Sequence, residues 1–140
     1  MKKEQIERLI DIASAQRRYS YAPYSEYRVG AALLAGNGKI YTGCNVENAA
    51  FSPSICAERT AVAKAVSEGV REFVAICIVG GRGETPEGYS PPCGMCRQTL
   101  REFCDPGSFE IIVATSRTHY EIHTLQEFFP DSFGPENLHS

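Results

Sequence analysis

Two short cysteine motifs in this sequence could build a metal site. The first is C-A-E at 56–58 and the second is P-C-G-M-C at 92–96. Because residues three apart on a helix lie on one face, Cys93 and Cys96 can direct both sulfur atoms towards the same point. Together with Cys56 they could bind a zinc ion and leave its fourth tetrahedral position open to water. That arrangement is typical of catalytic rather than structural zinc sites.

Glu58 adds a carboxylate to this candidate zinc site. It follows Cys56 by two residues, so it could reach the same cavity without binding the metal. Zinc lowers the pKa of a bound water, and a nearby carboxylate can accept the proton and deliver it elsewhere. Three thiolates also give the site an excess negative charge. We expect Arg59 and Arg97, which lie beside the ligands in the sequence, to reduce it by hydrogen bonding to the thiolates.

The cysteines also allow other interpretations. A lone C-x-x-C motif occurs in redox pairs and in halves of structural zinc sites. If Cys104 were a fourth ligand, the site would be closed and purely structural. Cys44, Cys77 and Cys104 lie in or beside apolar segments, however, and we expect them to be packed thiols. Metal analysis with thiol counting would decide, since an open site protects three cysteines and a closed module protects four.

Two predicted helices carry the cysteine motifs. One begins at Cys56 and ends before Gly69, and the other begins near Cys93. The positive end of a helix dipole favours the thiolate form that binds metal. In a layered α/β fold, two such helices can bring their N-termini together at one edge of a sheet.

The rest of the chain supplies that sheet. The pattern predicts a helix, a β-hairpin, a strand buried on both faces, two further strands and a short helix, at residues 3–18, 27–46, 73–79, 110–115, 120–124 and 125–129. The last two strands are too close in sequence for a crossover, so we expect them to be antiparallel. This order indicates a single α/β domain over residues 1–140, with a mixed sheet flanked by helices.

Composition excludes several classes of protein. The 140 residues are 43% hydrophobic and 22% charged, as in ordinary globular domains and unlike disordered or fibrous chains. The net charge of −3 gives no footprint for nucleic acid, and no apolar run is long enough for a membrane helix. Charged side chains near the N-terminus interrupt any signal-peptide core. We therefore expect a cytoplasmic protein with reduced thiols.

The pair C-x-E and P-C-x-x-C is the signature of zinc-dependent deaminases in its three-cysteine form. Around it, the chain resembles the cytidine deaminases, a family of small homotetrameric nucleoside deaminases. The similar stretches extend over nearly the whole chain, at 24–33, 43–52, 56–61, 92–98 and 129–135. The resemblance implies a three-layer cytidine-deaminase-like fold with a five-stranded mixed sheet, one zinc ion per chain and a homotetramer.

The resemblance also implies an activity, the hydrolytic deamination of cytidine and 2′-deoxycytidine to the uridines with release of ammonia, as in pyrimidine salvage. Cys56, Cys93 and Cys96 would hold the zinc. A zinc-bound hydroxide would attack C4 of the pyrimidine. Glu58 would carry protons between the water, the pyrimidine N3 and the departing amine.

Substrate contacts follow from the same resemblance. Asn45 and Glu47 would bind the ribose hydroxyls, and the backbone N–H of Ala57 would bind the pyrimidine O2. Tyr27 would lie at the base, where the family commonly has phenylalanine, so its hydroxyl requires a partner. Phe133 would reach the base from a neighbouring subunit.

Three other functions stay open as alternatives. A related deaminase could act on another aminopyrimidine nucleoside such as blasticidin S, although Asn45 and Glu47 favour an ordinary nucleoside. Phe51, where many relatives have tyrosine, could remove one polar contact near the substrate or an interface. A polynucleotide deaminase is disfavoured by the acidic charge and the short final hairpin. A structural zinc module would catalyse no reaction.

Overall fold

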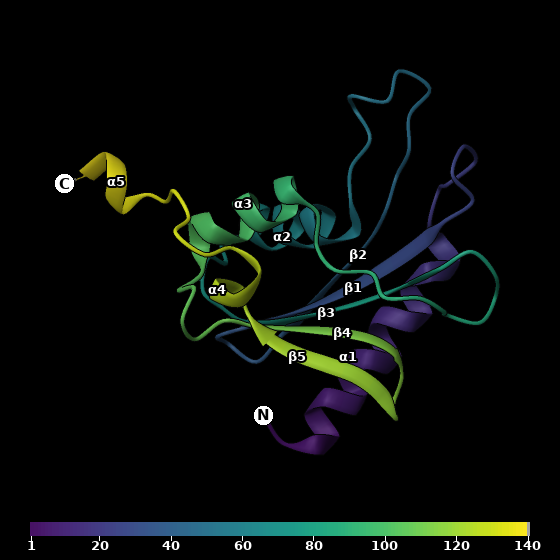
Figure 1. The fold of residues 1–140 in the computed structure, drawn as a ribbon, viewed down its shortest axis with the longest axis horizontal. Helices are drawn as coiled ribbons and strands as arrows, with labels where there is room; N and C mark the ends of the chain where they lie inside the picture. Colours follow the sequence, from purple (N-terminus) through teal and green to yellow (C-terminus); the bar gives the residue numbers. More distant parts are fainter. Residues whose placement is uncertain (140) are drawn as a thin grey trace.

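The structure, a computed structural model, describes residues 1–139 and contains a five-stranded mixed sheet between two helical layers (Figure 1). This confirms the predicted fold. The elements in chain order are α1 (Lys3–Gln16), the 3₁₀ turn η1 (Arg17–Tyr19), β1 (Arg28–Ala35), β2 (Ile40–Cys44), α2 (Ala57–Ser67), β3 (Phe73–Gly81), α3 (Gly94–Phe103), β4 (Glu110–Ser116), β5 (His119–Thr124), α4 (Leu125–Phe128) and α5 (Glu136–His139).

The strands lie in the order β2-β1-β3-β4-β5. β1 pairs antiparallel with both β2 and β3, and β4 pairs antiparallel with β5 as predicted. β3 and β4 are parallel, because α3 crosses between them. After β3 the chain runs back through a long loop to α3, which lies on the same side of the sheet as α2 (Figure 1).

The central strand β3 is buried on both faces, as its apolar run predicted. Ile76 and Ile78 belong to the core cluster beneath α2 and α3, whereas Cys77 and Val79 belong to the cluster beneath α1. The helix α1 contributes an apolar stripe to the second cluster, made up of Ile6, Leu9, Ile10 and Ala13. Two packed cores on opposite faces therefore hold the sheet rigid under the site.

Two glycines let the helices approach the hairpin at backbone distance. A Cβ on Gly30 would lie 1.9 Å from the carbonyl oxygen of Ala13 in α1. A Cβ on Gly43 would lie 2.3 Å from the carbonyl oxygen of Ala57 in α2. Any side chain at either position would push the helix away. Gly43 thus fixes where the first turn of α2 rests on the sheet.

Several boundaries differ from the sequence prediction. The helix predicted over 3–18 ends at Gln16 and continues as the 3₁₀ turn, where Arg17 turns inward and becomes buried. After residue 129, where the sequence predicted no helix or strand, the structure has the short helix α5, which projects away from the sheet (Figure 1). Within residues 1–139, no helix has both the length and the apolar character needed to cross a membrane.

Candidate active site

Three thiols meet where the N-termini of α2 and α3 come together. Cys56 and Cys93 are the N-cap residues of the two helices, and Cys96 lies in the first turn of α3. The Sγ atom of Cys93 lies 3.5 Å from that of Cys56 and 3.3 Å from that of Cys96. Among the described residues, these three form the one group of three or more cysteine, histidine or acidic side chains close enough to share an ion.

The donor set fits zinc. Sulfur ligands about 2.3 Å from one zinc ion lie about 3.8 Å apart in a tetrahedral arrangement, close to the spacing of these thiols. Hydrogen bonding from Cys96, and further from Cys93 and Arg59, lowers the pKa of Cys56 to about 5 despite its partial burial. A thiolate is therefore present at neutral pH, which is the form that binds metal.

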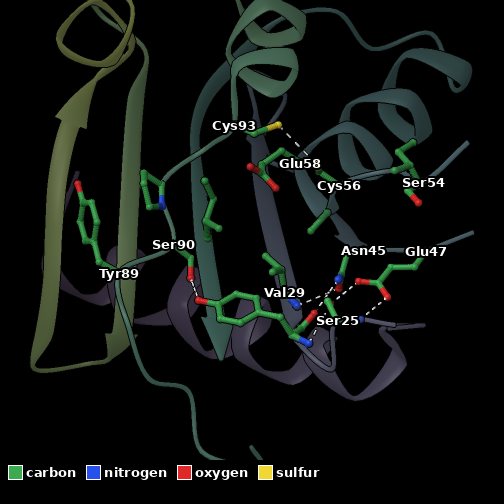
Figure 2. Close-up of a pocket in the computed structure, with 15 residues that line it drawn as sticks. Ser25, Val29, Asn45, Glu47, Ser54, Cys56, Glu58, Tyr89, Ser90 and Cys93 are labelled. Atoms are coloured by element: carbon green, nitrogen blue, oxygen red, sulfur yellow. Dashed lines mark hydrogen bonds between the residues drawn. The ribbon is translucent and has the colours of Figure 1, made fainter. Parts of the chain in front are cut away.

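Glu58 lies in the first turn of α2, beside the thiols. Its side chain is only 4% exposed, and burial raises its pKa to about 7. In Figure 2 the carboxylate of Glu58 lies with Cys56 and Cys93 at one end of a pocket. A buried carboxyl group with a pKa near neutrality can both accept and release a proton at physiological pH.

The pocket has a volume of about 460 Å³, within the range of small-molecule sites. It brings together most of the residues that the resemblance assigned to the substrate. Its lining comprises Ser25, Tyr27, Val29, Asn45, Glu47, Ser54, Ile55, Cys56, Ala57, Glu58, Ile78, Tyr89, Ser90, Pro91 and Cys93. In Figure 2, Asn45 and Glu47 form a polar end of the pocket that lies below the metal end made by Cys93, Glu58 and Cys56.

Asn45 and Glu47 also hold the loop that precedes β1. The Nδ2 of Asn45 donates to the carbonyl of Tyr27 at 2.8 Å, and its Oδ1 accepts from the N–H of Val29 at 2.9 Å. The carboxylate of Glu47 accepts from the N–H of Tyr24 at 3.0 Å and from the backbone and hydroxyl of Ser25. These bonds place both side chains on the pocket wall.

The two arginines predicted beside the metal have different surroundings. Burial opposes the charge of Arg59, but hydrogen bonds and attraction to the Cys56 and Cys96 sulfurs outweigh it and raise its pKa. Its Nη2 also donates to the carbonyl of Ser54 at 3.1 Å. Arg97 directs Nη1 to the carbonyl of Phe128 at 2.6 Å. Arg97 therefore joins α3 to α4.

Phe133 lies outside this chain's own pocket and is 57% exposed. It sits on the C-terminal tail, which α3 anchors through side chains. Gln98 donates to the carbonyl of Phe133 at 3.0 Å, and the Nε of Arg101 donates to the hydroxyl of Ser132 at 2.8 Å. Arg101 also forms an ion pair with Glu136. The tail thus presents the Phe133 ring outwards.

The other cysteines are separate from the metal cluster. Cys77 is fully buried in the core beneath α1, and Cys104 is 5% exposed at the end of α3. Burial raises the pKa of Cys104 to about 12, so it stays a neutral thiol. Cys44 is half-buried at the end of β2. All six cysteines of the chain are unbridged.

Sequence reasoning missed part of the pocket. The Gly- and Pro-rich segment 80–92 gave no predicted element and no candidate site residue, yet Tyr89, Ser90 and Pro91 line the cavity. The available signal was their position, because these residues immediately precede Cys93 and must therefore approach the metal site. Ser25 was also missed, because its contact with Glu47 joins residues that lie far apart in the sequence.

The fold and the three-thiol site define a zinc-dependent hydrolase of the deaminase type. The family model for the cytidine and deoxycytidylate deaminase zinc-binding region matches residues 3–110. The chain belongs to this family.

Individual relatives agree with that assignment. A cytidine deaminase of Sporosarcina psychrophila is 45% identical over 95% of this chain and 94% of the relative. A probable cytidine deaminase of Dictyostelium discoideum is 42% identical over 99% of this chain and 90% of the relative. Among solved structures, the cytidine deaminase from Burkholderia pseudomallei is similar with a TM-score of 0.81 at 41% identity, covering 90% of this chain and 97% of that one.

Proposed function

We propose that this chain deaminates cytidine and 2′-deoxycytidine hydrolytically, producing uridine or 2′-deoxyuridine and ammonia. The observation that carries the proposal is the buried Glu58 carboxylate beside three thiols at one end of a nucleoside-sized pocket. Family membership and the names of the relatives support the same reaction.

Cys56, Cys93 and Cys96 would hold one zinc ion per chain. When bound there, zinc acts as a Lewis acid that makes water a nucleophile at neutral pH. Cys56 is the N-cap residue of α2, where the positive end of the helix dipole favours its thiolate. Arg59, which interacts with the Cys56 and Cys96 sulfurs, would offset part of the thiolate charge.

Glu58 is the proton carrier in this proposal. Its carboxylate would accept one proton from the attacking water and deliver it to the pyrimidine N3. It would then accept the remaining proton of that water from the new C4 hydroxyl and deliver it to the amine as the C4–N bond breaks. Burial serves this role, since it holds the pKa of Glu58 near neutrality and keeps bulk water away from the transfer.

Binding of the nucleoside would orient C4 towards the metal end. Asn45 and Glu47 would hydrogen-bond the ribose hydroxyls, and the N–H of Ala57 at the start of α2 would bind the pyrimidine O2. The Tyr27 ring would pack on the base. Because contacts to the sugar position the reacting ring, free cytosine should be a poor substrate.

We also propose that residues 1–140 form one domain and that the enzyme is a cytoplasmic homotetramer. A reducing compartment would keep the three site thiols available for zinc. The outward-facing Phe133 ring would complete the pocket of a neighbouring subunit. The exposed aromatic pair Tyr24 and Phe51, whose ring centroids lie 6.2 Å apart, provides an apolar contact of the kind that subunit interfaces use.

The direct test follows the ultraviolet absorbance of cytidine after mixing with pure protein, before and after chelation. We expect a steady decrease that chelation abolishes and added zinc restores. Glu58→Gln should keep its zinc while turnover falls by about 100-fold or more. Absence of reaction by the zinc-loaded protein, or unchanged turnover in Glu58→Gln, would refute the proposal. Thiol counting should find three protected cysteines rather than four.

A further inference from the structure

The loop 82–91, between β3 and α3, forms one wall of the pocket and must be held in place from outside itself. The start of the loop is held by Arg17, which is only 4% exposed. Its guanidinium donates to the carbonyls of Gly81 at 2.8 Å, Gly83 at 2.6 Å and Glu84 at 3.1 Å. These bonds fix where the loop leaves β3. They do not reach the pocket-lining end, residues 89–91.

That other end is joined to Tyr27 by a hydrogen bond between two hydroxyls. The ring hydroxyl of Tyr27 bonds the side-chain hydroxyl of Ser90, and the bond is the dashed line from Ser90 in Figure 2. Both residues are half-buried and both line the pocket. The partner that the Tyr27 hydroxyl required is therefore Ser90, which lies three residues before Cys93.

The packing around this bond leaves little freedom. A Cβ on Gly80 would lie 2.4 Å from the Ser90 hydroxyl oxygen and 2.9 Å from Cε1 of Tyr27. The glycine thus provides the space that the two side chains share. A Cβ on Gly88 would lie 3.7 Å from the Tyr27 hydroxyl oxygen, so the loop backbone also passes close to this hydroxyl.

The backbone of Tyr27 is fixed by residues at the polar end of the pocket. Its carbonyl accepts from Asn45 at 2.8 Å, and its N–H donates to the Ser25 hydroxyl at 3.0 Å. Ser25 in turn bonds the Glu47 carboxylate. A continuous set of hydrogen bonds therefore runs from the proposed ribose site, through Tyr27, to the segment that leads into Cys93.

We propose that Tyr27 and Ser90 form a hydroxyl clasp that positions the 88–91 wall of the nucleoside pocket. This inference rests on the proposed deamination of cytidine. Both are positioning residues, because the clasp acts by holding the wall against the substrate and not by taking part in proton transfer. Glu58 and Cys96 lie in the first turns of α2 and α3, and Cys56 and Cys93 are the N-cap residues of these helices. Both helices pack against the sheet, so we expect that opening the clasp leaves the reacting groups in place.

The test is a double-mutant cycle with Tyr27→Phe and Ser90→Ala in the zinc-loaded enzyme. Each variant removes one hydroxyl and keeps the remaining packing. Loss of one hydrogen bond should raise KM for cytidine about fivefold, with kcat changed less than about twofold. The double variant should be no worse than either single variant, because both remove the same bond. Tyr19→Phe, which removes an exposed hydroxyl from a ring outside the pocket, should match the wild type.

Amide hydrogen exchange gives a second readout that does not depend on activity. Residues 82–91 should exchange faster in both single variants than in the wild type, while α2 and β3 should be unchanged. Unchanged KM in both single variants, or an additive increase of about 25-fold in the double variant, would overturn the clasp. A fall in kcat with loss of zinc would overturn it as well. If the wild type fails to act on cytidine, the proposed function fails, and exchange in the 82–91 loop still tests the clasp.

Discussion

Replacing Gly43 by alanine should destabilise the fold and disturb the metal site together. A Cβ at position 43 would lie 2.3 Å from the carbonyl oxygen of Ala57 and 2.6 Å from the amide nitrogen of Ala61. Ordinary contact begins at 3.4 Å, so β2 and α2 would have to separate locally by about 1 Å. Both clashing atoms belong to the backbone, and no change of side-chain rotamer relieves them. Overpacking of this kind costs about 1–3 kcal/mol.

The displacement would fall on the first turn of α2, which carries Glu58 and follows Cys56. Misplacing a catalytic group by about 1 Å can cost about 100-fold in rate. We therefore expect Gly43→Ala to lower the urea midpoint of unfolding and to reduce both zinc content and kcat for cytidine. Urea titration, metal analysis and the absorbance assay measure the three effects on one preparation.

Gly36→Ala is the matched control. A Cβ there would lie 3.4 Å from the Cβ of Glu72, which is ordinary contact, and Gly36 is not in the left-handed region of backbone conformation. The unfolding free energy of Gly36→Ala should fall by less than about 1 kcal/mol, and it could even increase, because alanine restricts the unfolded chain. Equal urea midpoints for the two variants, with full zinc content in Gly43→Ala, would refute the packing argument.

Three further predictions concern other parts of the molecule. Hydrogen bonds to Glu121 and then Glu127 raise the pKa of His123 above 6.5, so their stabilising contribution is complete below about pH 6.5 and is lost as the pH rises through the folded pKa. The urea midpoint of unfolding should thus fall more between pH 5.5 and pH 8 in the wild type than in His123→Gln. An equal fall in the two proteins would exclude a stabilising contribution from these hydrogen bonds. Arg101→Ala removes the bonds to Ser132 and Glu136 and should release the C-terminal tail. We expect faster proteolysis within 130–138 at unchanged zinc content, and an unchanged cleavage rate would show that other contacts hold the tail. Removal of zinc by a chelator should lower the melting temperature, and added zinc should restore it. If free zinc in the loaded sample stands at about 1,000 times its dissociation constant, the stability lost is about 4 kcal/mol. A constant melting temperature would contradict zinc binding to the folded state.

The metal cluster was the part of the site most readily predicted from sequence. Residue type and local spacing were sufficient for it: Cys93 and Cys96 share a helix turn, and helix patterning placed Cys56 at a second N-terminus. The strands were predicted for a similar reason, since the short apolar run 73–79 favours a strand that is buried on both faces.

The rest depends on contacts between segments far apart in the chain. Nothing local to Gly43 indicates that α2 would rest on it, because the clash exists only after the hairpin and helix pack. Ser90 lies in a segment without periodicity, so its bond to Tyr27 could not be read from a pattern. The buried side chain of Arg17 likewise depends on carbonyl groups supplied by the distant residues 81–84.

The distance along the chain between Cys56 and Cys93, 37 residues, has a consequence for biosynthesis. During synthesis, the part of the chain up to the end of β3 offers the ion only Cys56 of the three ligands. Cys93 and Cys96 follow later, at the start of α3. The ion therefore cannot template the early stages of folding. Metal capture by all three thiols instead requires the chain to have been made through the first turn of α3, so nascent fragments that stop short of α3 compete poorly for cellular zinc.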